Sequence, residues 1–134
     1  MKSLLLFVAV LCAVALSGSS ASSVANEANA GKKERAVVIF GSPVNLMGKE
    51  VQGEYLVVHD EAAMARGEAC TYVYKGRAEK SNRLVVAFHC TPKARDKAKS
   101  FTVRSVMTPA GNYEVREFQF KGSGEGHLVP VEVD

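Results

Sequence analysis

The residues with the most varied chemistry in this 134-residue chain are its histidines and the last two of its three cysteines. They are His59, Cys70, His89, Cys90 and His127. Imidazole nitrogens and thiolates bind zinc and copper, and a thiol beside an imidazole can act as a nucleophile. Two of these residues bound the stretch HDEAAMARGEAC (59–70), which also holds three acidic side chains and Met64. This stretch is therefore either part of a chemical site, or a strand end, a turn and half of a disulfide.

The spacing of the two cysteines favours a disulfide. Cys70 opens one predicted strand and Cys90 closes the next, and the midpoint between them falls in the turn KGRAEKSNR. A symmetric hairpin would place them directly opposite each other, about 4.5–5.5 Å apart at Cα, which is within disulfide range. Such a bond stabilises a small domain by roughly 3 kcal/mol in the chain-entropy model. The alternative is that both thiolates bind a metal ion.

The elements that must position these residues are short apolar runs rich in Val, Phe, Tyr and Thr. The runs are AVVIF (36–40), EYLVVH (54–59), CTYVY (70–74), LVVAFHC (84–90), FTVRSVM (101–107), YEVREFQF (113–120) and HLVPVEV (127–133). Seven such runs, separated by Gly, Pro, Asn and charged residues, predict an all-β fold. We expect one sandwich or flattened barrel of about seven antiparallel strands with one short helical turn at EAAMAR (61–66), capped by Asp60. The apolar phase changes within YEVREFQF, which predicts a β-bulge near Arg116–Glu117.

An up-and-down order of these strands would bring the histidines to one rim of the fold. The predicted metal ligands at that rim are His59, His89, His127 and Met64, for copper or zinc. A cupredoxin is the natural comparison, but Cys90 is followed by TPKARDK, with no His or Met shortly downstream. Motifs such as HExxH and CxxC are also missing from the sequence. Taken singly, each histidine is more often a structural residue, so we expect no cofactor, with a copper or zinc site as the alternative.

The signals for catalysis are weaker. Glu61, Glu68 and Glu125 fall at the same predicted rim and could act as acids or bases in a hydrolase, but the sequence has no GxSxG elbow. Cys70 with His89 could form a thiol–imidazole pair, yet a disulfide would consume the thiol. We therefore expect a non-enzymatic protein, with a hydrolase as the less favoured alternative.

A basic loop, KARDKAK, follows Cys90 and suggests a second kind of ligand. It carries Lys93, Arg95, Lys97 and Lys99 against the single Asp96. Such a cluster could bind an anionic envelope component or an acidic protein, although a solvated loop is the simpler interpretation. The loop has no interleaved aromatic residues, and the formal net charge of the chain is only +3, so nucleic acid is not expected as a partner.

The N-terminus has the pattern of a secretory signal peptide. One Lys precedes an apolar run from Leu4 to Leu16, which is followed by small residues and is shorter than a membrane span. We predict a signal peptide at 1–25, with cleavage after Ala25 or else after Ala21 or Ala30. A flexible lead-in at 26–35 and one domain at 36–134 follow. The mature chain is expected to be secreted or periplasmic, with no segment that spans a membrane.

The segments GEYLVVHDEAAMARGEACTYVY, LVVAFHC and REFQFKGSGEGHLVP share a pattern with other proteins. With its G-x-Y strand, H-D-x-x-x-M-A-x-G-x-x-C and F-H-C, the chain resembles a group of small exported bacterial proteins. The resemblance covers most of residues 53–130 and implies export and a bacterial source, but no activity. The sequence thus predicts an exported, disulfide-stapled β-domain that binds a ligand or associates with the envelope. A copper- or zinc-binding protein is the alternative.

Overall fold

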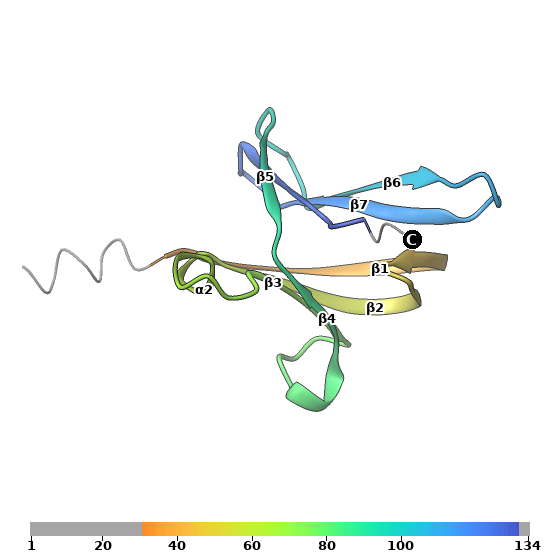
Figure 1. Ribbon diagram of the computed structural model, residues 1–134, viewed down its shortest axis with the longest axis horizontal. Helices are drawn as coiled ribbons and strands as arrows, with labels where there is room; N and C mark the ends of the chain where they lie inside the picture. Colours follow the sequence, from red (N-terminus) through yellow and green to blue (C-terminus); the bar gives the residue numbers. More distant parts are fainter. Residues whose placement is uncertain (1–30, 132–134) are drawn as a thin grey trace, which may run out of the picture.

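The described residues of the computed structural model, 31–131, form one sheet of eight strands with one short helix and one 3-10 turn (Figure 1). The elements are β1 (Lys33–Leu46), β2 (Lys49–Asp60), α2 (Glu61–Ala65), β3 (Thr71–Lys75), η1 (Ser81–Arg83), β4 (Leu84–Phe88), β5 (Thr91–Ala94), β6 (Thr102–Met107), β7 (Tyr113–Gln119) and β8 (Glu125–Leu128). The strand order is β4-β3-β2-β1-β7-β8-β5, and β6 pairs with β7.

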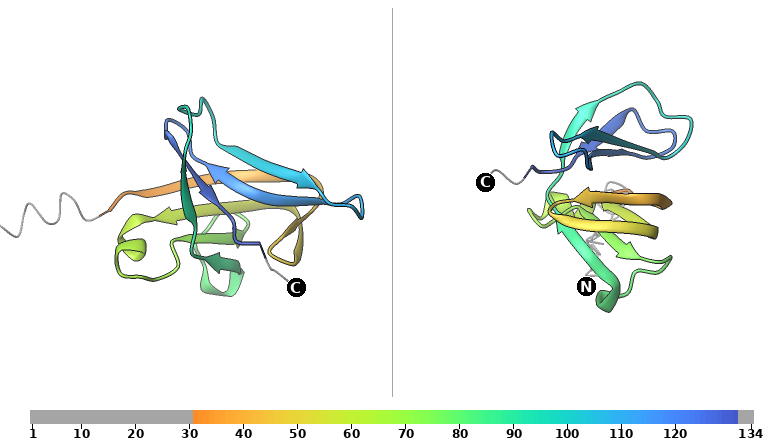
Figure 2. Two further views of the ribbon diagram at one scale, coloured as in Figure 1. Left: turned by 45° about the horizontal axis from the view of Figure 1, so that its top comes forward. Right: turned by 90° about the vertical axis from the view of Figure 1, so that its right-hand side faces the viewer.

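The sheet curls into a half-barrel, as the two views of Figure 2 show. Strands β1 to β3 form one side of the half-barrel and β6 to β8 form the other (Figure 1). The chain crosses from the first side to the second between β4 and β5. The two sides are joined by a short parallel contact between β1 and β7, while the other strand pairs are antiparallel. The predicted all-β class, with strands in a flattened barrel and one short helical turn, is confirmed.

Strands β1 and β2 are the longest strands of the sheet and form one hairpin. Its turn is Met47–Gly48, and both residues have positive φ, 50° and 76°, as a two-residue turn of this hand requires. The register shifts between Phe40 and Val44, where the segment around Pro43 bulges out of the ladder. The strand that was predicted at 36–40 therefore continues on both sides of this bulge.

The core lies inside the curl and is built mainly from valine and phenylalanine. Phe118 of β7 is fully buried and lies next to Phe88 and Phe101, with ring centroids 6.5 and 6.0 Å away. The predicted bulge in β7 is also present, because Arg104 pairs with Glu117 while Ser105 pairs with Val115, which leaves Arg116 without a partner in the ladder. The bulge allows both Val115 and Phe118, which have opposite parity in the sequence, to lie in the core.

Three boundaries differ from the sequence-based expectation. β5 was not predicted, because TPKA has no apolar pattern; it is held by pairing with β8. β8 ends at Leu128, before Pro130, so the run predicted at 127–133 is shortened. β1 begins at Lys33, inside the predicted lead-in, because Lys33 pairs with Asp60 across the hairpin. The predicted signal peptide lies outside the described residues, and no helix within 31–131 has the length and apolar character to cross a membrane.

Candidate metal centre

Two histidines from distant parts of the chain meet in the interior. His59 lies near the end of β2 and is 0% exposed, and His127 lies in β8 and is 2% exposed. Their rings are stacked, with centroids 3.9 Å apart and planes inclined by 26°. Phe120 covers both rings, at 6.4 Å from His59 and 5.9 Å from His127. The curl of the sheet therefore creates a buried imidazole pair that no local sequence motif encodes.

The end of β2 is fixed by the helical turn that follows it. Oδ1 of Asp60 accepts hydrogen bonds from the backbone N–H groups of Ala62 and Ala63, at 3.0 and 3.2 Å. This is an ordinary N-cap, and it turns the chain away from the strand directly after His59. Ala63 is buried, so α2 closes this end of the half-barrel. The stretch 59–70 is thus a strand end and one helical turn that leads to Cys70.

Cys90 adds a sulfur to the imidazole pair. Its Sγ lies 3.6 Å from Nδ1 of His127, and ligand atoms of His59, Cys90 and His127 all lie within 4.8 Å of one another. Two ligands on one tetrahedral zinc ion, a thiolate at about 2.3 Å and an imidazole at about 2.05 Å, are separated by about 3.5 Å. The Cys90–His127 distance already matches one edge of such a site.

Cys70 lies on the other side of Cys90. The two Sγ atoms are 2.6 Å apart, and the backbone N–H of Cys90 is 3.2 Å from Sγ of Cys70. The Sγ–Sγ distance is longer than the S–S bond of about 2.05 Å, and the structure does not join the two cysteines by a disulfide. The ladder pairs Thr71 with Phe88, so Cys90 lies one residue beyond the position opposite Cys70. The predicted direct opposition is wrong by one residue. Tyr74 pairs with Leu84, so the hairpin is centred on residue 79 and not on residue 80, and the register then shifts before Val73 pairs with Val86. The two sulfurs are nevertheless close together.

The ring nitrogens of the two histidines are poorly satisfied. Both nitrogens of His59 and Nε2 of His127 are buried and have no hydrogen-bond partner among the described residues. Burial lowers the pKa of both imidazoles, and for His59 the neighbouring His127 lowers it further. Both rings are therefore neutral at pH 7 and present lone pairs, which is the form that binds a metal ion.

Carboxylates surround the imidazole pair. Glu34 lies opposite His59 across the β1–β2 ladder, and oxygens of Glu34 and Glu61 lie within 4.8 Å of a His59 nitrogen and of each other. On the other side, Oε1 of Glu125 is 3.8 Å from Nδ1 of His127. Carboxylates beside ligating imidazoles orient the rings and favour a bound cation. Glu34 was not identified from the sequence, since only the register of the hairpin places it here.

Two of the predicted ligands do not join this cluster. His89 is exposed, whereas its neighbours Phe88 and Cys90 are buried, as alternation along an extended segment requires. Met64 is 39% exposed on the outer side of α2. The structure therefore brings together His59 and His127 of the predicted set, and adds Cys90.

The arrangement does not favour nucleophilic catalysis. Burial and the neighbouring Cys70 raise the pKa of Cys90 to about 12, so its thiol is protonated at neutral pH. The predicted acids and bases of a hydrolase, Glu61, Glu68 and Glu125, are exposed, and Glu68 forms an ion pair with Arg66. None of these three glutamates lines any of the four surface pockets found among the described residues.

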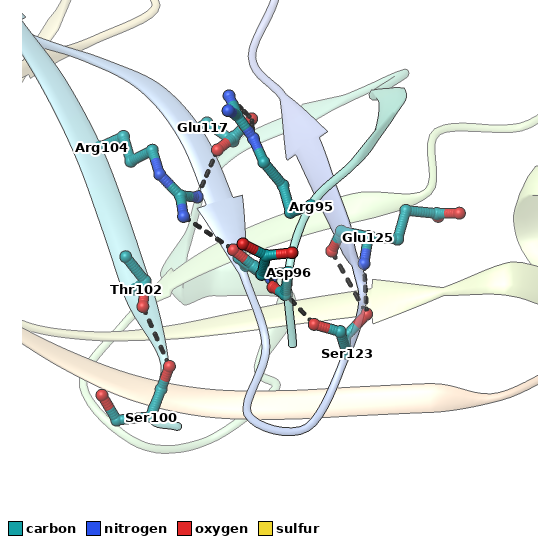
Figure 3. Close-up of polar contacts among 9 residues, drawn as sticks. Arg95, Asp96, Ser100, Thr102, Arg104, Glu117, Ser123 and Glu125 are labelled. Carbon is teal, nitrogen blue, oxygen red and sulfur yellow. Dashed lines mark hydrogen bonds and ion pairs between the residues drawn. The ribbon is translucent and has the colours of Figure 1, made fainter. Parts of the chain in front are cut away.

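The basic loop is partly used inside the protein. Arg95 donates hydrogen bonds of 3.1 and 2.8 Å to the buried carboxylate of Glu117, which also pairs with Arg104 (Figure 3). The three lysines of the predicted anion site, Lys93, Lys97 and Lys99, are exposed. A second basic surface, not identified from the sequence, surrounds the turn after β3; its pocket is lined in part by Lys75, Arg77, Lys80 and Arg83. Anion binding at the basic loop stays a prediction.

Comparisons of the chain with protein-family models, with curated proteins and with solved structures give no match.

Proposed function

We propose that the protein is an exported, non-enzymatic domain that binds a zinc or copper ion through His59, His127 and Cys90. The observation that carries this proposal is the convergence of two neutral, buried imidazoles with unpaired nitrogens beside a buried sulfur. Nitrogen and sulfur donors suit zinc and copper, whereas magnesium and calcium require oxygen donors.

A purely structural role explains the histidine pair less well. A buried polar atom without a partner costs about 1–3 kcal/mol, and three ring nitrogens are in this position. Apolar side chains at these positions would avoid that cost while filling the same space. A bound ion would use the lone pairs, and the carboxylates of Glu34, Glu61 and Glu125 would offset its charge.

The proposed site lies next to a surface pocket. This pocket is lined in part by Glu34, Phe120 and Lys121. Glu34 faces His59, and the ring of Phe120 covers both histidines. A small movement of this ring would open the imidazole pair toward the pocket, with Glu34 as the first carboxylate that an incoming cation meets.

The proposal is tested by metal titration of the reduced mature protein. Zinc and copper(I) are offered in competition with a chromogenic chelator, and we expect one ion per chain. The double variant His59→Ala, His127→Ala should lose this binding, because two of three ligands are removed. His89→Ala is the matched control and should bind normally, since His89 is exposed and lies outside the cluster. Equal binding by all three proteins, or no binding by the wild type, would refute the proposal.

Glu34 should tune the affinity without being a ligand. Replacing Glu34 with Gln removes a negative charge next to His59, and we expect the metal affinity to fall about 10–100-fold, as is typical when a carboxylate beside a ligating histidine is lost. The same competition titration measures the change. Glu50→Gln, at the opposite end of the β1–β2 hairpin, is the control and should have no effect. An unchanged affinity in Glu34→Gln would place Glu34 outside the site.

A further inference from the structure

We propose that Cys70 and Cys90 form a redox pair that controls the metal site: the two thiols bind the ion together with the histidines, and their disulfide releases it. This inference rests on the proposed function. Its basis is that one sulfur, Sγ of Cys90, touches both partners, at 2.6 Å from Sγ of Cys70 and 3.6 Å from Nδ1 of His127.

The two roles of Cys90 exclude each other. Metal ions are bound by a thiolate, and a sulfur in a disulfide has no thiolate charge to donate. An oxidised Cys70–Cys90 pair therefore leaves the ion with the two imidazoles of His59 and His127 and the nearby carboxylates. A reduced pair can supply one or two thiolates, and with both of them the donors become the Cys2His2 set of a closed tetrahedral site.

The sulfur of Cys70 lies close to polar groups of two neighbouring residues. The backbone N–H of Cys90 points to Sγ of Cys70 at 3.2 Å, and Oγ1 of Thr71 lies 3.9 Å from the same sulfur. Cys70 can thus become the fourth ligand after a small rotation of its side chain, because its sulfur already touches that of Cys90.

Release of the ion requires a two-electron oxidant, and a disulfide RSSR can serve as this oxidant. In the bound state both thiols have lost their protons to solvent and their sulfurs hold the ion. One thiolate attacks a disulfide RSSR, forming a mixed disulfide and releasing RS⁻; the second thiolate attacks the mixed disulfide, closes the Cys70–Cys90 bond and releases a second RS⁻. Two electrons pass from the cysteines to RSSR, and the ion leaves. A dithiol reverses the sequence and restores the site.

The test follows zinc and thiols together. Mature protein is reduced with a phosphine, loaded with one zinc ion and then treated with oxidised glutathione under argon. Released zinc is measured with a chromogenic chelator, and free thiols are counted by alkylation and mass spectrometry. We expect one zinc ion to be released for every two thiols lost, and dithiothreitol to restore binding. Zinc that stays bound after both thiols have formed the disulfide would overturn the inference while leaving the proposed function intact.

The Cys70→Ser variant separates gating from simple oxidation of a ligand. It keeps Cys90 and both histidines, so it should still bind zinc, but it cannot form the internal disulfide. We expect oxidised glutathione to release its zinc at least tenfold more slowly than from the wild type. Cys70→Ala, with folding checked by circular dichroism, should behave in the same way; release as fast as from the wild type in either folded variant would overturn the gating role of Cys70. If the reduced wild type binds no zinc or copper(I), the proposed function fails, and this inference fails with it.

Discussion

Replacing His59 with Leu should raise the stability of the metal-free protein and at the same time abolish its metal binding. His59 is fully buried, and neither of its ring nitrogens has a hydrogen-bond partner among the described residues. Leu fills a similar volume without polar atoms, so the cost of the unpaired nitrogens disappears. Against this gain stands the lost stacking on His127, worth about 0.5–1.5 kcal/mol. We expect a net increase of about 1 kcal/mol in the free energy of unfolding.

The metal affinity should change in the opposite direction. Loss of one of three ligands should lower it more than loss of a supporting carboxylate does, so by more than about 100-fold. Urea unfolding with and without zinc measures both effects in one series. The wild type should be stabilised by zinc, and His59→Leu should not, because a ligand that binds only the native state adds to its stability. His89→Leu, at an exposed position, should leave both values unchanged.

A higher free energy of unfolding together with a lower metal affinity would distinguish a functional histidine from a structural one. A structural histidine contributes contacts that its replacement removes, and the free energy of unfolding then falls. If His59→Leu destabilised the metal-free protein by about 1 kcal/mol or more, its nitrogens would have to be paired, for example with a buried water molecule. That result would remove the main support for a metal centre.

Much of the fold could be predicted because the strands have strong local signals. The runs EYLVVH, YVY and LVVAF are β-branched and aromatic and became β2, β3 and β4. The bulge at Arg116 was predictable because the apolar phase reverses there, and a change of phase needs an extra residue. Strand β5 could not be predicted, because all four residues of TPKA are exposed and the segment is a strand only through its pairing with β8.

The site was predicted in part, for a reason that lies in strand alternation. His59 and His127 were expected at one rim, and they do meet, with Cys90 beside them. His89 was expected with them because it is adjacent to Cys90 in sequence. Adjacent residues in an extended segment point to opposite sides, however, so the burial of Cys90 places His89 in solvent.

Glu34 could not be found from the sequence because the β1–β2 register depends on the bulge. Counted outward from the turn, where Leu46 pairs with Lys49, His59 would oppose Ala36. The irregular segment between Phe40 and Val44 shifts the pairing by two residues, and His59 opposes Glu34 instead. The side-chain period of a strand is two, so this shift keeps every residue on its face but changes its partner from apolar to acidic.

Replacing Glu117 with Gln should destabilise the protein more than the loss of a carboxylate from its surface does. The carboxylate of Glu117 is buried, and it accepts hydrogen bonds from Arg95 of the basic loop and Arg104 of β6 (Figure 3). Arg104 also donates to Gln119 at 2.8 Å, and Nε2 of Gln119 donates to the backbone oxygens of Asp96 and Ser123. One buried charge thus ties the basic loop and the turn KGSG (121–124) to β6 and β7.

The expected cost follows from this burial. Removing one partner of a buried ion pair costs about 3–5 kcal/mol, but the side chains of Arg95 and Arg104 are 32% and 40% exposed and can be partly solvated. We therefore expect Glu117→Gln to lower the free energy of unfolding by about 2–3 kcal/mol at pH 7. Glu114→Gln, which breaks a pair with Arg116 nearer the surface, is the matched control and should cost less than about 1 kcal/mol.

The pH dependence gives an independent check on the same carboxylate. Burial alone would raise the pKa of Glu117, but the hydrogen bonds from Arg95 and Arg104 outweigh it and hold the pKa below that of an ordinary glutamate. The unfolded chain therefore takes up a proton on Glu117 at a higher pH than the folded protein does. The stabilisation is complete above about pH 5 and is lost as the pH falls below the ordinary glutamate value of about 4.3 and through the lower folded value.

Urea unfolding between pH 7 and pH 3 should thus show the gap between the wild type and Glu117→Gln narrowing as the acid protonates the carboxylate. A gap that stays constant over this range would mean that Gln disturbs packing rather than charge.

The carboxyl group of Glu117 is packed directly against Gly126, the residue before His127. A Cβ atom on Gly126 would lie only 2.7 Å from Cδ of Glu117. A loss of metal affinity in Glu117→Gln at neutral pH would show that this ion-pair network also holds β8, and with it the histidine, in place.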